Sequence, residues 1–120
     1  MSSSGLRSRP PAWNVLEQAV IEKRTVRVNY HGHDRLLCPH LLGWKNGRPK
    51  VLCYQSSGTT SEGKLNSDPR QRWRLMFVDE MERPVMTDDE WQTAANYRPG
   101  SKGIDIIELV VRSSTRQHPD

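Results

Sequence analysis

Short segments in which apolar and polar side chains alternate dominate residues 25–86, and no other feature constrains the fold as strongly. Alternation with a period of two is typical of half-buried strands. Polar turn sequences separate the segments, and Asn46-Gly47 is the strongest hairpin signal among them. We therefore expect a mainly β domain of about five antiparallel strands, at residues 25–30, 35–45, 51–55, 71–78 and 83–86.

The second segment, residues 35–45, is too long to stay flat. Pro39 lies inside it and has no backbone N–H to donate, which favours a bulge or bend at that point. Strong bending is what a small barrel requires, so we expect the sheet to close into one. The polar stretch at residues 56–69 predicts a mobile loop. In the segment at residues 71–78, alternation predicts one face with Trp73, Leu75 and Phe77 in the core.

Two helices are predicted at the flanks of these strands. Asn14 and Glu17 have the spacing of a capping box, which opens a helix extending to about Arg24. Thr87 and Glu90 repeat that spacing and predict a short helix through about Asn96. A final strand at residues 104–111 needs a partner edge, either within the domain or in another copy of the chain. The expected organisation is a disordered tail at 1–13, a domain at 14–86, an extension at 87–112 and a tail at 113–120.

Composition limits the class of protein. A chain of 120 residues with 34% hydrophobic residues forms one domain with a small core. No apolar run approaches the roughly 18 residues of a membrane span, and the first residues lack the apolar stretch of a signal peptide. These features predict a cytoplasmic protein with no membrane partner.

The two cysteines alternate within apolar segments, where a reduced Cys38 or Cys53 behaves as a small hydrophobe. A metal role for Cys38 would need further ligands, and His31, His33 and His40 are the candidates. The histidines at 31 and 33 fall in a turn with Gly32 and Asp34, which explains them without a metal. We therefore predict no metal site and no cofactor.

Charge is distributed unevenly along the sequence. Residues 25–78 contain nine Lys and Arg against three acidic residues, whereas residues 79–120 contain five against nine. Positive charge on the strand-rich half favours attraction of phosphates or nucleic acid, although a solvated basic surface without a partner explains any single lysine equally well.

Aromatic and arginine side chains recur on neighbouring predicted strands. Planar guanidinium groups bind phosphate oxygens in pairs, aromatic rings stack on bases, and polar side chains beside them can read a base edge. The candidate ligand-binding residues are Tyr30, His31, Arg35, His40, Tyr54, Gln55, Arg72 and Arg74. Catalytic sequence motifs such as a nucleophile elbow, a Walker loop or a zinc-hydrolase helix are absent from the sequence, and no residue is assigned a catalytic role. The pattern predicts a binding module and not an enzyme.

The order of these motifs resembles the WYL domain family. The matching features lie in residues 14–86: a helix, a strand ending in Tyr30, R-x-x-x-P at Arg35 to Pro39, a strand ending in Tyr54, and W-R-x-x-x-x-D at Trp73 to Asp79. The resemblance implies a small Sm-like β-barrel preceded by a helix. It also implies a ligand-sensing module of the kind found in bacterial transcription regulators and phage-defence loci, which binds nucleotides or nucleic-acid fragments through a basic, aromatic-edged pocket.

Carried over by position, the resemblance assigns pocket roles to Tyr30, Arg35, Tyr54 and Arg74. The W-Y-L tripeptide itself is replaced by residues 49–51, Pro-Lys-Val, and two arginines expected later in the fourth strand are replaced by Phe77 and Glu80. Regulators of this family usually carry a helix-turn-helix domain ahead of the WYL domain. Because only residues 1–13 precede the predicted helix, we expect a standalone module that acts alone or with a partner regulator in trans.

Two functions are consistent with these features. The first is a regulatory, ligand-sensing module that binds an anionic nucleotide or nucleic acid through a basic, tyrosine-edged pocket. The alternative is a protein-interaction or oligomerisation subunit that assembles through barrel edge strands, with residues 104–111 as the candidate homo-oligomer contact.

Overall fold

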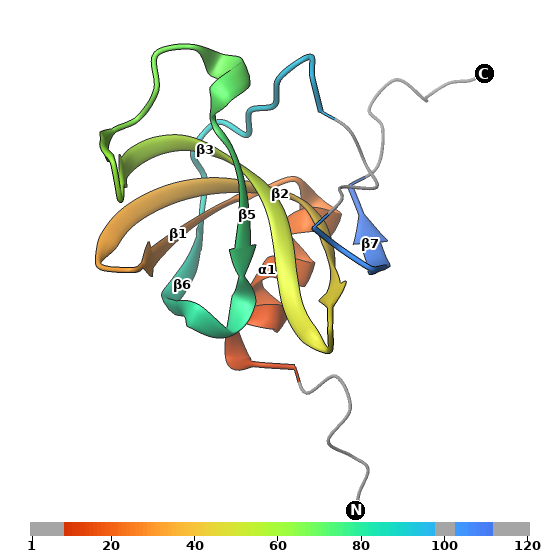
Figure 1. Ribbon diagram of the computed structural model, residues 1–120. Helices are drawn as coiled ribbons and strands as arrows, with labels where there is room; N and C mark the ends of the chain where they lie inside the picture. The colour runs from red at the N-terminus through yellow and green to blue at the C-terminus, as the bar shows by residue number, and fades with distance from the viewer. Residues whose placement is uncertain (1–8, 98–102, 112–120) are drawn as a thin grey trace, which may run out of the picture.

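The computed structural model describes residues 9–97 and 103–111 (Figure 1). A single α-helix precedes a sheet of seven strands, and two 3-10 helices flank the fifth strand. The elements are α1 (Pro11–Glu22), β1 (Thr25–Tyr30), β2 (His33–Lys45), β3 (Arg48–Thr60), β4 (Gly63–Lys64), η1 (Pro69–Gln71), β5 (Trp73–Phe77), η2 (Val78–Glu80), β6 (Met81–Thr87) and β7 (Ile106–Val110). The predicted mainly β class is confirmed.

All strand pairs in the sheet are antiparallel. The hydrogen-bonded order is β4-β3-β2-β1-β6, while β5 pairs with β3 and β7 pairs with β2. Among the described residues no ladder joins β5 to β6, so the sheet is not closed into the expected barrel. Instead η2 connects these two strands in sequence. The Tyr30 hydroxyl, at the end of β1, accepts a hydrogen bond of 3.1 Å from the Phe77 N–H at the end of β5.

The long strands β2 and β3 bend where their register shifts. One shift lies between Pro39 and Leu41, as predicted for a proline inside a strand. A second lies at residues 36–37, opposite Gln55 to Ser57. The hairpin between β2 and β3 turns at Asn46-Gly47, where both residues have positive φ as the predicted two-residue turn requires.

The segment at residues 56–69 was predicted to be a loop, and that prediction is wrong for its first half. β3 continues to Thr60, and a tight turn leads into β4. Thr59 and Thr60 pair with Lys64 and Gly63, so the chain forms a short hairpin that extends beyond the sheet. Turn residues outnumber apolar ones in this stretch, so a loop was predicted although the β-branched Thr59 and Thr60 favour a strand.

Helix α1 begins at Pro11, three residues earlier than predicted. The capping-box prediction is wrong, because Asn14 lies inside the helix and Pro10 at the N-cap makes no side-chain bond. Pro11 occupies the first helical position, where a missing N–H costs nothing. The helix packs on the sheet through Leu16, Ala19, Val20 and Trp13, whose ring stacks on Trp44 at 4.9 Å between centroids.

The core has two parts, and both include side chains from β5. Met76 is buried in the main cluster beneath α1, whereas Trp73 and Leu75 pack on the opposite side with Leu41, Leu52 and Ile104. The prediction of one core face for β5 is therefore incomplete, because both of its faces are covered.

No described helix has the length and apolar character needed to cross a membrane.

The predicted helix from Thr87 to Asn96 is absent; residues 88–97 form an irregular segment. The Thr87 side chain instead bonds Asp89 and contacts Thr25, which ends β6 without starting a helix. The predicted last strand is present as β7, and it finds its partner within the domain by pairing with β2. Of the predicted tails at residues 1–13 and 113–120, residues 1–8 and 113–120 lie outside the described residues, whereas residues 11–13 belong to α1.

Candidate functional site

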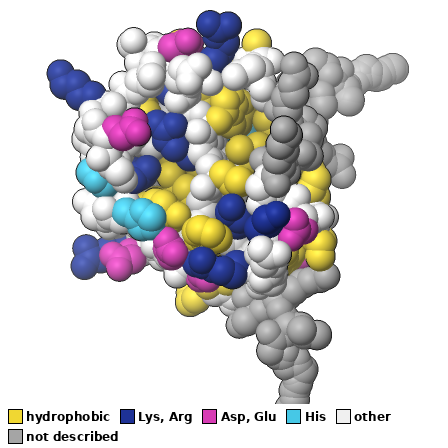
Figure 2. Space-filling model, viewed as in Figure 1, with side chains coloured by type: hydrophobic (Ala, Val, Ile, Leu, Met, Phe, Trp, Pro, Cys, Tyr) yellow, Lys and Arg dark blue, Asp and Glu magenta, His cyan; other side chains and the backbone are white. Residues whose placement is uncertain are grey.

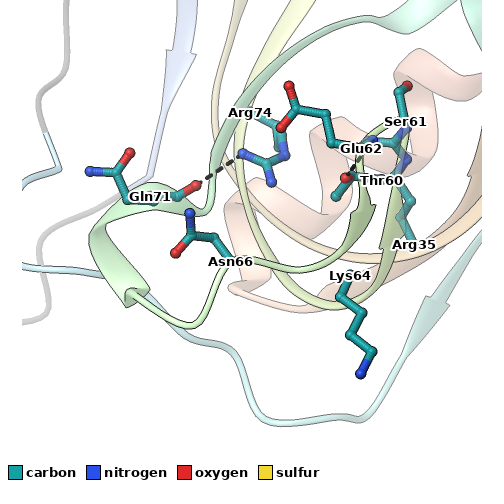
Figure 3. Close-up of a pocket in the computed structure, with 8 residues that line it drawn as sticks. All are labelled: Arg35, Thr60, Ser61, Glu62, Lys64, Asn66, Gln71 and Arg74. Atoms are coloured by element: carbon teal, nitrogen blue, oxygen red, sulfur yellow. Dashed lines mark hydrogen bonds between the residues drawn. The ribbon is translucent and has the colours of Figure 1, made fainter.

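A pocket of about 500 Å³ opens between the β3–β4 hairpin and the start of β5 (Figure 3). Its lining combines three cations with polar uncharged side chains and one carboxylate. The lining residues are Arg35, Thr60, Ser61, Glu62, Lys64, Asn66, Gln71 and Arg74. No aromatic ring is among them.

Arg35 is the most buried charged residue in the lining, with only 4% of the residue exposed. Its Nε has no hydrogen-bond partner among the described residues, and Nη1 reaches only the Gln55 Oε1, at a long 3.5 Å. Burial, together with the charge of Arg74, lowers the pKa of the Arg35 guanidinium. An arginine remains charged even so, which leaves a buried and poorly compensated cation.

Arg74 supplies the second guanidinium. Its Nη1 donates to the carbonyl oxygens of Gln71 and Trp73, each at 3.1 Å, which holds the side chain against the pocket wall (Figure 3). In the described part of the chain neither Arg35 nor Arg74 forms an ion pair with a carboxylate. Arg24, Arg27, Arg48 and Arg70 each have such a partner, whereas Arg72 and Arg83 have none among the described residues. Arg35 differs from these two because it is buried.

Gln55 and Tyr30 support Arg35 from behind the pocket. Gln55 is fully buried, and its Nε2 donates to the carbonyl oxygens of Ser57 and Thr59, at 3.1 and 3.0 Å. It therefore ties Arg35 to the hairpin that forms the opposite wall. The Arg35 guanidinium lies 5.3 Å from the centre of the Tyr30 ring, a cation–π contact. The Tyr30 side chain is 7% exposed, so it orients Arg35 and does not edge the pocket.

His40 lies elsewhere, in an aromatic cluster beneath the irregular segment. Its ring stacks on Trp91 at 4.3 Å and contacts Tyr97 and Trp73. Its Nδ1 bonds the Cys38 carbonyl at 2.7 Å, which makes Nδ1 the protonated nitrogen, and Nε2 then accepts from Thr93 at 2.9 Å. Burial lowers the pKa of His40 to about 4, so the ring is neutral at physiological pH.

The remaining sequence candidates also lie away from the pocket. His31 stacks on Tyr30 and bonds Glu80 at 2.6 Å on the outer surface. Tyr54 is 2% exposed and packs edge-on against Trp73. Arg72 donates from Nε to the Asn66 carbonyl at 2.7 Å, which shapes the loop that carries Asn66. Of the eight candidates, the structure brings Arg35 and Arg74 to the pocket, with Tyr30 and Gln55 in contact with Arg35.

Sequence reasoning missed six lining residues, all in the segment at 60–71. The available signal was the β-branched pair Thr59-Thr60 followed by Glu62-Gly63, which is compatible with a short hairpin. Lys64 is the only Lys or Arg in that hairpin, and Glu62 is the only carboxylate in the lining. The pocket thus carries a formal excess of two positive charges.

The viewed surface contains no continuous basic stripe (Figure 2). Lys and Arg side chains are spread over this face, with acidic and hydrophobic side chains between them.

Among residues 9–97 and 103–111, no group of three His, Cys, Asp or Glu side chains could hold a metal ion. Both cysteines are free and buried, and burial raises the pKa of each thiol.

Comparisons of this chain with protein-family models, with curated proteins and with solved structures found no significant match.

Proposed function

We propose that this protein is a non-enzymatic, WYL-like sensing module that binds an anionic nucleotide or nucleic-acid ligand in the pocket of Arg35 and Arg74. One observation carries the proposal: two neighbouring guanidinium groups, one of them buried, have no carboxylate partner in the described structure. A buried unpaired cation is costly, and a bound anion would remove that cost.

The arrangement of elements supports the family resemblance. A helix followed by strongly bent antiparallel strands is what the resemblance implies, and the β2–β3 register shifts supply the bending. η2 connects β5 to β6, and the Tyr30 hydroxyl joins β5 to β1, the neighbour of β6. We therefore propose an Sm-like barrel in which these contacts stand in place of a β5–β6 ladder.

The proposal also refines how a ligand would be held. The two tyrosines expected to stack a base are buried, Tyr30 against Arg35 and Tyr54 against Trp73. Recognition therefore depends on charge-assisted hydrogen bonds from the two arginines, with Lys64 at the outer wall.

A thermal-shift titration tests this function. We expect thymidine 5′-monophosphate and a short oligothymidylate to raise the melting temperature of the wild-type protein, because binding to the folded state stabilises it. The Arg35→Gln/Arg74→Gln variant should lose the shift. Arg27→Gln is the matched control, since Arg27 is 55% exposed, pairs with Asp34 and does not line the pocket. An equal shift in the double variant would show that the anion binds elsewhere.

A homo-oligomer remains the second candidate function, because three aliphatic side chains of β7 are exposed. Ile106, Ile107 and Val110 are each between 36% and 42% exposed on a short strand that pairs with β2. Apolar groups on such a strand favour contact with another copy. Light scattering at high protein concentration tests this candidate, and a monomeric mass would exclude it.

A further inference from the structure

We infer that the pocket recognises the terminal phosphate monoester of its ligand and discriminates against an internal phosphodiester. This inference rests on the proposed function, because it assigns the chemical group that Arg35 and Arg74 bind.

The burial of Arg35 limits what can reach it. Only 4% of this residue is exposed, and the β3–β4 hairpin packs directly on its backbone. Gly58 pairs with Arg35, and an added Cβ at Gly58 would lie 2.9 Å from the Arg35 Cα, so β3 covers the backbone of Arg35. A ligand therefore reaches the guanidinium through the pocket that Arg35 lines. A terminal group has one covalent attachment and can enter a site that is open at one end. An internal phosphodiester is attached on both sides, and both attachments would have to leave through the same opening.

The charge of the pocket favours a dianion. Arg35 and Arg74 are close enough that the charge of Arg74 disfavours protonation of Arg35, and no described carboxylate pairs with either. A phosphate monoester carries about −1.5 to −2 charges at pH 7 and has three terminal oxygens, enough for both guanidinium groups. A diester carries one charge and two free oxygens. Glu62 in the lining repels any anion, so the preference for the dianion depends on the formal excess of two positive charges in the pocket.

The rest of the lining indicates what bears the phosphate. Ser61, Asn66 and Gln71 offer hydroxyl and amide groups, which suit the hydroxyls of a sugar. The Thr60 hydroxyl instead bonds Gly63 and Glu62 within the turn. No aromatic ring lines the pocket, so stacking of a base contributes little there. The spread of basic side chains on the viewed face likewise offers no track for a long backbone (Figure 2). The favoured class is therefore a nucleotide, or the phosphorylated end of a short oligonucleotide.

Isothermal titration with matched ligands tests the inference on the full chain. The first pair is thymidine 5′-monophosphate and its methyl ester, which differ only by conversion of the monoester to a diester. The second pair is a thymidine dinucleotide with and without a 5′-phosphate. We expect each monoester to bind at least about tenfold more tightly than its partner. We also expect this preference to vanish in Arg35→Gln and in Arg74→Gln and to persist in Arg27→Gln.

The outcomes separate the inference from the proposed function. Equal affinities within each pair, lost together in the arginine variants, would overturn the inference and leave the anion site in place. Binding that the arginine variants do not weaken, or no binding by any of the four ligands, would overturn both. A thermal unfolding curve of each variant checks that it is folded. If either Arg35→Gln or Arg74→Gln fails to fold, the other still tests the inference.

Discussion

Arg35 combines near-complete burial with poor pairing. Its guanidinium has one long hydrogen bond to Gln55 and a cation–π contact with Tyr30, while Nε has no partner in the described structure. A charge that served the fold alone would be expected to have a carboxylate beside it, since an isolated buried ion reduces stability. The arrangement is typical of a residue retained for binding, at a cost to the folded protein.

We therefore predict that Arg35→Met stabilises the ligand-free protein. Replacing a poorly paired buried cation by an apolar side chain of similar volume should raise the free energy of unfolding by about 1 kcal/mol. Urea unfolding without added anion measures the change, and titration with thymidine 5′-monophosphate should show loss of binding. A lower free energy of unfolding would show that Arg35 has a structural role.

Gln55 should behave in the opposite way. Gln55→Met removes two part-buried hydrogen bonds to the backbone carbonyls of Ser57 and Thr59, and it also removes the acceptor of the buried Arg35. We expect the free energy of unfolding to fall by about 2 kcal/mol, because unpaired buried polar groups are costly. Gln71→Met, at an exposed position, is the control and should unfold like the wild type in the same urea titration. Similar curves for both variants would contradict the supporting role of Gln55.

At the scale of elements, the β3–β4 hairpin decides whether the pocket exists. It supplies four of the lining residues and reaches its position because β3 passes directly over the start of β2 at Gly58. Gly58 has φ of +100°, and an added Cβ would lie 2.3 Å from the Asp34 carbonyl oxygen. Gly63, in the same hairpin, has φ of +105° with no atom within 4 Å of the added Cβ.

Substitutions at these two glycines distinguish the cost of backbone strain from the cost of a steric clash, because only Gly58 has atoms close to an added Cβ. Gly63→Ala should cost about 1 kcal/mol of stability from its positive φ alone. We expect Gly58→Ala to cost at least about 2 kcal/mol, because β2 and β3 must also move apart. Urea unfolding measures both, and phosphate-ligand affinity should fall only in Gly58→Ala. An equal fall in the free energy of unfolding for both variants would show that β2 and β3 move apart at no further cost in stability.

At the scale of the whole molecule, His40 links stability to pH. Burial in the cluster of Trp73, Trp91 and Tyr97, which joins residues 88–97 to the sheet, keeps its ring neutral. The pKa of His40 is about 4 in the folded protein and about 6.5 in the unfolded chain. Below pH 6.5 the unfolded state binds the proton and the folded state does not, so stability falls as the pH decreases towards 4.

We predict that the free energy of unfolding falls by about 2 kcal/mol as the pH is lowered from 7.5 to 5, because of the low pKa of His40 in the folded protein. Carboxylates whose pKa is lowered, such as Glu80 and Asp105, lose their contribution mainly below about pH 4.5 and so lie outside this window. Urea unfolding across the range should show the fall in the wild type and a smaller one in His40→Gln. The same pH dependence in both would show that His40 protonates without penalty.

The sequence predicted most of the strands and only part of the pocket. Residues 25–30 were assigned correctly from alternation, and Asn46-Gly47 and Pro39 located a turn and a bulge, because each of these signals acts locally. The box at Asn14 misplaced the start of a helix that does form, because Pro11 begins it. The box at Thr87 predicted a helix that is absent, because the Thr87 side chain bonds Asp89 instead. Arg35 and Arg74 were named as site residues, and the resemblance set them apart from Arg72 and His40, but it gave Tyr30 and Tyr54 the same pocket role.

By itself the sequence determined the mainly β class, the positions of the turns and the residue types available for an anion site. These depend on interactions between near neighbours in the chain. Tertiary structure decided which cations meet, because Arg35 and Arg74 come from β2 and β5 and are brought together through β3, which pairs with both. It also decided burial, which turned Tyr30 and Gln55 into supports of Arg35 and His40 into part of the core. Burial and the meeting of distant strands depend on long-range packing, which a pattern of neighbouring residues does not contain.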